Sequence, residues 1–411
     1  MNQNLIIPHL FRTEYTKIVA VLWKTYGWSN IQIAEDFVSD TFLKATETWS
    51  LKGVPENPKA WLYTVAKNKA KDTFKRNDLF HDKILPELKT TANHESLELD
   101  FSDENIEDSQ LQMMFAICNP INPNDAQIVL ALRILCGFSP QEIANALLSN
   151  TSSINKKLYR AKEKLRSNQI NLAFPGEDDL LPRLNNVMTI IYLLFNEGYY
   201  STTTPQTIRK DLCYESMRLL LLLLANKQTN LPSGNALMAL FCFHASRFES
   251  RTSDNGEILL MHEQDPSNWD NALILKGEEY LNLSAAGTTL TKYHVEAMIA
   301  RWHADVNADT IEKWPSILQL YNRLLQIEFS PITALQRTYA LAKVKGSKVA
   351  LNEAKKIPLD DYHLYHALLG ELQKDTNKSA ALEHFTKAID LSTNEADRKL
   401  LQKKIDDLKI D

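Results

Sequence analysis

Apolar residues recur through most of this chain at the spacing of one helical face, three or four positions apart. No segment keeps the strict apolar and polar alternation of a half-buried strand, and glycine is sparse, with 11 residues among 411. The spacing therefore predicts an all-α protein. Because 44% of the residues are hydrophobic, each of two or three domains can bury a core of its own.

Three helices are predicted in residues 1–76. The apolar stripe of the first consists of Phe11, Tyr15, Ile18, Val19, Leu22, Trp23 and Tyr26. The stripe of the second consists of Ala34, Phe37, Val38, Thr41, Phe42, Ala45 and Trp49. After a break, Asn57 and Pro58 supply a cap and a first-turn proline, so the third helix is expected from about residue 59 to residue 76.

Composition changes twice further along the chain. Acidic residues prevail in residues 77–109, which predicts a flexible acidic linker. Helical patterning returns in residues 110–170, and Pro175 with Gly176 marks a second boundary. Residues 178–411 form a succession of amphipathic helices. Its last part has small and aromatic residues spaced as in a tetratricopeptide unit, which predicts a tetratricopeptide-like helical array: Gly370, Ala381, Phe385 and Ala388.

The clearest local signal is a pair of short helices. Ser139 can cap the first helix, with Pro140 in its first turn and Glu142 closing a capping box. The second helix is apolar on one face, which consists of Ile154, Leu158, Ala161 and Leu165, and basic on the other. This pattern suits a helix-turn-helix that lays its second helix in the DNA major groove, although a solvated basic face is the alternative. The residues expected to contact DNA are Ser153, Asn155, Lys156, Lys157, Arg160 and Lys164.

The helix expected at 59–76 is also basic, although the chain as a whole carries a net charge of −5. Cations with interleaved aromatic rings suit a single strand, because ammonium groups follow the backbone while rings stack on unpaired bases. The candidate residues are Trp61, Lys67, Asn68, Lys71, Lys75 and Arg76. The alternative is that Trp61 and Tyr63 are ordinary core residues.

An acidic helix with Glu35, Asp36, Asp40 and Phe42, followed by a proline-containing loop and this basic helix, resembles region 2 of extracytoplasmic-function (ECF) sigma factors. The resemblance implies that the acidic segment docks on the beta-prime coiled coil of core RNA polymerase. It also implies that the basic helix captures and melts the -10 element of the promoter. Residues 110–166 look like region 4 of the same family, which binds the -35 element.

The rest of the chain resembles a sigma subgroup whose C-terminal extension contains tetratricopeptide-like repeats. The resemblance is carried by the segment 191–199, by Gln264-Asp265 with Trp269-Asp270, and by Ala297–Ala300 with His303. An extension of this size is expected to control the sigma part from within the chain, by activating or by inhibiting it, and to bind a protein or a small ligand.

Catalysis is not expected. The four cysteines, Cys118, Cys136, Cys213 and Cys242, form no C-x-x-C pair, so reduced and buried thiols are predicted. Metal-ligand spacings, phosphate-binding glycine loops and nucleophile elbows are missing from the sequence, so no metal and no cofactor are expected. The N-terminus lacks a signal-peptide pattern, which predicts a cytoplasmic protein. A conventional helix-turn-helix regulator with a helical sensor domain is the main alternative function, and an enzyme is a weaker one.

Overall fold

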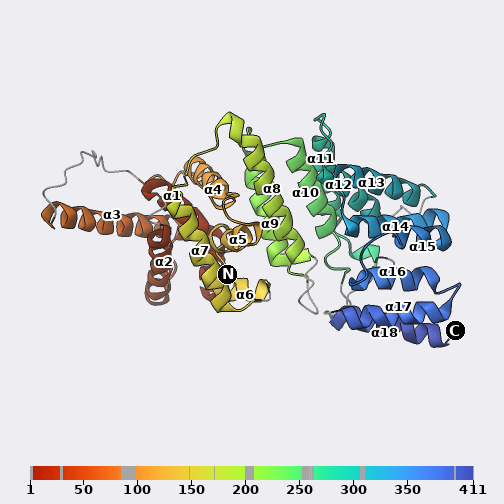
Figure 1. Cartoon of the computed structure of the whole chain (residues 1–411). Coiled ribbons are helices and arrows are strands. Elements are labelled where there is room, and N and C mark those ends of the chain that lie inside the picture. Colours follow the sequence, from red (N-terminus) through yellow and green to blue (C-terminus); the bar gives the residue numbers. More distant parts are fainter. Residues whose placement is uncertain are drawn as a thin grey trace. The chain divides into compact units, whose positions relative to one another are not determined.

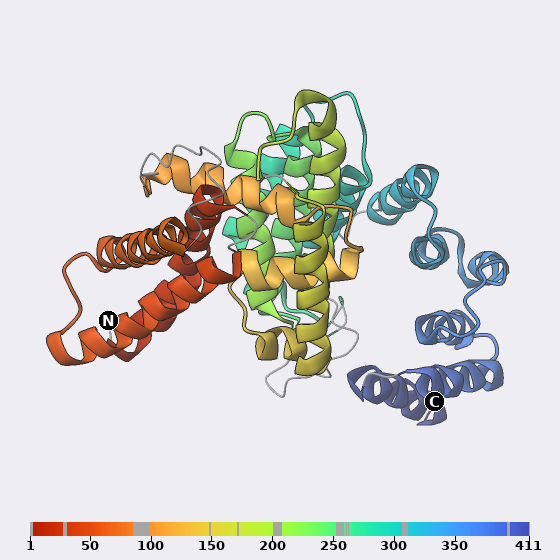
Figure 2. The same cartoon turned by 60° about the vertical axis from the view of Figure 1, so that its left-hand side comes forward.

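The structure is a computed structural model. It describes residues 3–27, 31–84, 99–147, 149–170, 172–199, 208–251, 259, 261, 263–305, 311–392 and 395–410. Every regular element within these ranges is a helix, which confirms the predicted all-α class. The chain divides into two compact units, Met1–Leu193 and Leu194–Asp411, and Figures 1 and 2 show the helices of each.

The N-terminal unit contains seven α-helices, one π-helical turn and the first part of an eighth α-helix among its described residues. They are α1 (Gln3–Tyr26), α2 (Ile31–Lys52), α3 (Pro58–Ile84), α4 (Asp103–Ile117), α5 (Asn124–Leu130), the π-helical turn η2 (Ala131–Leu135), α6 (Pro140–Ala146), α7 (Thr151–Ser167) and the beginning of α8 (Glu177–Tyr199). Helix α1 packs against both α2 and α4.

The two apolar stripes of the first helices form much of this unit's core. Tyr15, Ile18 and Trp23 of α1 are fully buried, and Val38 and Ala45 of α2 are buried beside them. Burial of these side chains removes a large apolar area from water, which is the main driving force for packing α1 against its neighbours. The stripe prediction is therefore confirmed at these positions.

Local signals also set the start of α3. The Asn57 side chain accepts a hydrogen bond from the backbone nitrogen of Ala60, at 3.0 Å, and the helix begins at Pro58. However, α3 continues to Ile84 and α4 already begins at Asp103, so both ends of the linker expected at 77–109 are helical. Just before α4, Ser102 caps the helix and Leu99 is buried in the unit.

Helix α8 begins close to the boundary expected near Pro175 and Gly176, yet its first turns belong to the N-terminal unit. Arg183 donates a hydrogen bond to the carbonyl of Phe115. Asn186 donates to the carbonyl of Cys118, at 2.6 Å, and to the side chain of Gln127, at 2.9 Å. These contacts place residues 178–193 with the helices before them. The two units therefore divide after Leu193, within α8, and not at the expected boundary near Gly176.

The C-terminal unit continues with α9 (Lys210–Ala225), α10 (Pro232–Ala245), the short 3-10 turn η3 (Pro266–Asn268), α11 (Asn271–Ser284), α12 (Lys292–Ala304), α13 (Lys313–Ile327), α14 (Pro331–Lys345), α15 (Ser347–Ala354), α16 (His363–Gln373), α17 (Lys378–Leu391) and α18 (Glu395–Ile410). Helices adjacent in sequence pack against each other, and the blue part of Figure 2 shows the last of them following one another in a row.

Two close helix crossings in this unit depend on glycine. A Cβ at Gly277 of α11 would lie 2.6 Å from the ring of Phe243, and one at Gly370 of α16 would lie 2.7 Å from the ring of Phe385. Phe385 is buried with Ala381, as the tetratricopeptide-like spacing requires. The helix pair α16 and α17 therefore has the interior that the sequence predicted, while its assignment to that repeat family stays a prediction.

All four cysteines are free and buried. Burial raises the pKa of the Cys118, Cys213 and Cys242 thiols to about 12, so these groups are protonated at neutral pH. Among the described residues, no cluster of His, Cys, Asp and Glu could hold a metal ion. None of the described helices is both long and apolar enough to cross a bilayer.

Candidate functional site

Helices α6 and α7 lie where the sequence predicted a pair of helices. The Ser139 hydroxyl accepts a hydrogen bond from the Glu142 backbone nitrogen, at 3.2 Å, and the Glu142 carboxylate accepts one from the Ser139 nitrogen, at 2.8 Å. This capping box fixes the start of α6. Asn150 caps α7 by accepting from the backbone nitrogen of Ser153, at 2.7 Å, so α7 begins at Thr151.

The two faces of α7 are as different as the sequence indicated. Its buried residues are Ile154, Leu158, Ala161 and Leu165. Five of the six predicted DNA contacts are exposed on the other side, namely Ser153, Asn155, Lys156, Arg160 and Lys164. The helix therefore offers a polar and cationic outer surface that needs no rearrangement of its own to meet a polyanion.

Lys157 is the sixth predicted contact, and it is half-buried. Its ammonium group forms an ion pair with Asp125 of α5, at 2.6 Å. The hydrogen bond from Lys157 holds the pKa of the Asp125 carboxyl below its usual value. Lys157 thus anchors α7 to α5, and much of its charge is already matched within the protein.

The predicted -10 surface lies along α3. Asn68 and Lys71 are exposed, while Trp61 and Lys67 are half-buried. The side chains of Lys75 and Arg76 lie outside the described part of the chain. This face is therefore described over its N-terminal half only.

The aromatic residues of α3 contact their neighbours in the fold. The ring of Trp61 lies edge-on to Trp49, with 5.3 Å between centroids. Tyr63 stacks on Phe101, at 4.8 Å, and its hydroxyl donates a hydrogen bond to Glu14, at 2.6 Å. Burial first, and then the hydrogen bond and charge of Glu14, raise the pKa of Tyr63. For Tyr63 the core interpretation is supported, whereas Trp61 keeps part of its ring accessible.

The four predicted docking residues of α2 lie in different environments. Asp36 is exposed. Asp40 is exposed too, and it forms an ion pair with Lys69 of α3. Phe42 is 4% exposed and lines a groove of about 480 Å³ between α1 and α2 on one side and Phe138 and Glu142 on the other.

Glu35, unlike Asp36 and Asp40, is buried. Its side chain is 5% exposed and lies between two cations. Its Oε1 atom is 2.9 Å from Nε of Arg133, an ion pair whose geometry is not that of a hydrogen bond. Its Oε2 atom accepts a hydrogen bond from Nζ of Lys162 on α7. The sequence indicated neither cation as a partner, because Arg133 and Lys162 lie 98 and 127 positions from Glu35.

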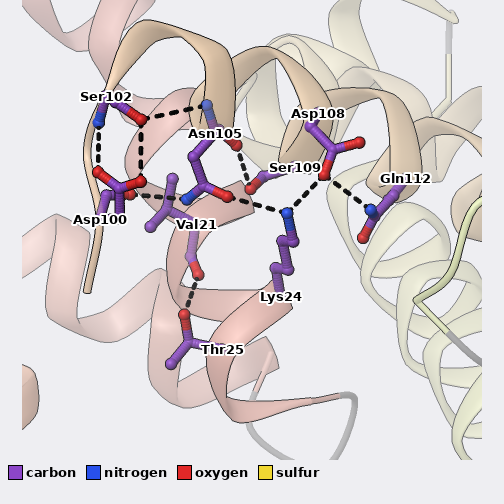
Figure 3. Close-up of polar contacts among 9 residues, drawn as sticks. All are labelled: Val21, Lys24, Thr25, Asp100, Ser102, Asn105, Asp108, Ser109 and Gln112. Atoms are coloured by element: carbon purple, nitrogen blue, oxygen red, sulfur yellow. Dashed lines mark hydrogen bonds and ion pairs between the residues drawn. The ribbon is translucent and has the colours of Figure 1, made fainter. Parts of the chain in front are cut away.

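A second polar contact joins α1 to α4 (Figure 3). The ammonium group of Lys24 donates to the Asn105 side chain, at 2.9 Å, and to the Asp108 carboxylate, at 2.5 Å. Gln112 donates to the same carboxylate, at 2.9 Å. In the buried part of the same contact between α1 and α4, the Gln110 amide donates to the hydroxyl of Thr16. The segments predicted as regions 2 and 4 are thus packed together in one compact unit.

Two aspartates of the C-terminal unit cap the beginnings of helices. Asp265 accepts a hydrogen bond from the backbone nitrogen of Ser267, at 2.9 Å, and Asp270 accepts two from the first turn of α11. Glu197 is half-buried, and burial raises its pKa. His262 lies outside the described residues. Asp265 and Asp270 thus satisfy backbone donors at the beginnings of η3 and α11.

Two family models match the chain. One, for Sigma-70 region 2, covers residues 10–80, which include α2 and most of α3. The other, for a family of unknown function (DUF6596), covers residues 183–285. An uncharacterized protein of Rhizobium meliloti (strain 1021) is 30% identical over 386 residues, which is 92% of this chain and 90% of the relative. No solved structure matches.

The region 2 match supports a sigma-70 family factor, a class that binds core RNA polymerase and promoter DNA to initiate transcription. More particularly, it belongs to the same family as the uncharacterized Rhizobium protein, since the similarity runs through both units.

Proposed function

We propose that this protein is an ECF-type sigma factor that recognises a promoter through α3 and α7 and is controlled by its own C-terminal helices. The observation that carries the proposal is the exposed polar and cationic face of α7, which follows a Sigma-70 region 2 match in the same chain. A conventional regulator has no use for the region 2 segment. The combination therefore favours promoter opening over simple operator binding.

On this proposal, α7 reads the -35 element. Side chains near the start of a recognition helix reach base edges, which assigns base contacts to Ser153, Asn155 and Lys156. Arg160 and Lys164, further along the same face, bind phosphates. The ion pair of Lys157 with Asp125 supports a positioning role for that residue, beside any phosphate contact.

The -10 element is assigned to α3. Lys67, Asn68 and Lys71 follow the strand, and the accessible part of Trp61 stacks on an unpaired base. Lys75 and Arg76 extend this basic surface in sequence. Tyr63 takes no part, because it is engaged with Glu14 and Phe101.

Binding of core polymerase is assigned to α2, which would contact the beta-prime coiled coil. Asp36 is the best-supported contact, because it is exposed on the acidic segment. Asp40 is exposed as well, although Lys69 competes for its charge. A cationic partner surface would be steered toward these carboxylates.

Run-off transcription with purified core polymerase, promoter DNA and no other sigma factor tests the function. We expect a transcript that starts at a fixed position and disappears without the protein. A conventional regulator would bind DNA yet give no transcript unless another sigma factor is added, and that result would overturn the proposal. An enzyme acting on a small molecule would do neither.

We further propose that residues 194–411 form a tetratricopeptide-like module that senses a protein or small ligand and controls the sigma part. A tethered domain meets its target at an effective concentration near millimolar, so weak contacts are enough. Comparing residues 1–193 with the full chain in transcription tests this control. The cut follows residue 193, because a cut at 178 would remove Arg183 and Asn186 from their hydrogen bonds. Equal activity under every condition would remove the regulatory role.

A further inference from the structure

Glu35 connects three segments that lie far apart in sequence. It belongs to α2, while Arg133 belongs to η2 and Lys162 to α7. The two cations are about four-fifths buried, with exposed side-chain fractions of 22% and 20%. Because a buried carboxylate without its partners is strongly disfavoured, the ions are stable here only while all three segments stay together.

The contact between Lys24 and Asp108 closes the same unit at a second place, between α1 and α4. Lys24 is 30% exposed and Asp108 is 44% exposed, so this pair is more easily replaced by water than the Glu35 cluster. The region 2 and region 4 segments are thus joined by one buried set of ion pairs, around Glu35, and by one partly hydrated ion pair, between Lys24 and Asp108.

This closed arrangement conflicts with simultaneous binding of both promoter elements. The -10 and -35 elements are centred about 25 base pairs apart, which is roughly 85 Å at the axial rise of DNA. Helices α2 and α7 contact each other through Glu35 and Lys162, so the surfaces beside them cannot reach both elements. Promoter binding therefore requires the region 2 and region 4 segments to separate.

We infer that the N-terminal unit is a closed, idle form of the sigma factor, locked by Glu35 between Arg133 and Lys162. The inference rests on the proposed function and concerns its regulation. In the closed form, Lys162 and Arg133 occupy a carboxylate of the acidic docking segment. Arg133 and Lys162 then compete with the polymerase for the Glu35 carboxylate. Only molecules in the open form therefore bind core polymerase.

Spin-label distance measurements on the full chain test the lock directly. Labels are attached through Glu47→Cys on α2 and Ser167→Cys on α7, both at exposed positions. The natural cysteines are buried, and three of them have a pKa near 12, so labelling is confined to the new thiols. Lys162→Glu, which sets a second carboxylate against Glu35, is expected to shift the distance distribution to longer values.

Arg166→Glu is the matched control. It reverses a charge on the same helix, but Arg166 is 58% exposed and forms its ion pair with Glu163 of its own helix. We expect its distance distribution to equal that of the parent chain. Lys162→Gln provides a milder version of the lock variant, and circular dichroism checks that all variants keep their helices. If both Lys162 variants leave the distances unchanged, the lock is wrong.

Core-polymerase binding separates failure of the lock from failure of the proposed function. Apparent affinity rises with the open fraction, so Lys162→Glu is expected to bind core on the order of tenfold more tightly. Glu35→Gln should lengthen the distances without this gain, because it also removes a docking charge. Longer distances in the Lys162 variants with no core binding by any form would support the lock and overturn the sigma function.

Discussion

The two units are held together in different ways. In the N-terminal unit, polar contacts join residues far apart in sequence, as in Glu35 with Lys162 and Lys24 with Asp108. In the C-terminal unit from α12 onward, the core contains successive small clusters, each made by neighbouring helices. Val295 packs with Leu324 in one of them, and Phe385 packs with Leu401 in another.

This difference predicts different responses to stress. A row of local clusters behaves as a sum of neighbouring layers, so damage to one layer is felt mainly by the next. A unit closed by a few long-range contacts can instead exchange one arrangement for another when those contacts break. The first design suits a binding array, and the second suits a switch.

The largest expected effect is on the C-terminal row. Phe385→Ala removes a fully buried ring that fills the space above Gly370, and should cost about 3–5 kcal/mol of unfolding free energy. Hydrogen exchange should show lost protection in α16, α17 and α18, with α7 unchanged. Equal loss of protection in α7 would contradict the local character of this unit.

A second prediction concerns the DNA surface of the N-terminal unit. Lys156→Ala should change base preference at the -35 element by about 1–3 kcal/mol, because it removes a contact to base edges. Arg160→Ala should weaken all sequences alike and lower the salt dependence of binding, because it removes a phosphate contact. Binding titrations on promoter and scrambled duplexes distinguish the two, and unchanged affinity in both variants would remove α7 from the DNA interface.

Loss of the capping box should have a smaller effect. Ser139→Ala leaves the Glu142 backbone nitrogen without its side-chain acceptor and should lower the unfolding free energy by about 1 kcal/mol. Because α6 packs on α7, chemical denaturation should show the loss in the N-terminal unit. Ser139→Asp, which keeps an N-cap acceptor, is the control and should stay near the parent stability.

The smallest expected effect sharpens the contrast between the units. Lys24→Gln should cost only about 0.2–1 kcal/mol, and the cost should vanish in high salt, because the ion pair with Asp108 is partly hydrated. Lys404→Gln breaks a comparably exposed pair with Glu371 in the C-terminal unit. We expect only Lys24→Gln to lengthen the spin-label distances, and equal effects of both variants would contradict the role of the α1 and α4 seam.

Local features of the fold were predictable from the sequence. The start of α3 at Pro58, the capping box at Ser139 and the buried face of α7 each depend on residues within a few positions of one another. Helical period and capping chemistry are sufficient for such features.

Long-range features were not predictable in the same way. Glu35 stands in a segment with the composition of an exposed acidic helix. It is nevertheless buried, beside cations that lie 98 and 127 positions later in the chain. Likewise, Pro175 and Gly176 stand just before the start of α8, but nothing local indicated that Asn186 would bond back to Cys118. Which faces meet is decided by tertiary packing, and a single sequence carries little information about it.

The π-helical turn η2 makes the Glu35 cluster sensitive to chain length. The backbone nitrogen of Cys136 bonds to the carbonyl of Ala131, five residues back, so this turn holds one residue more than an α-helical turn. Deleting a single residue within Ala131–Leu135 would restore α-helical winding and rotate the helix before the turn by about 100° relative to the chain after it. Arg133 would then face away from Glu35. A one-codon deletion is therefore enough to separate Arg133 from this carboxylate, without any substitution at Glu35, Arg133 or Lys162.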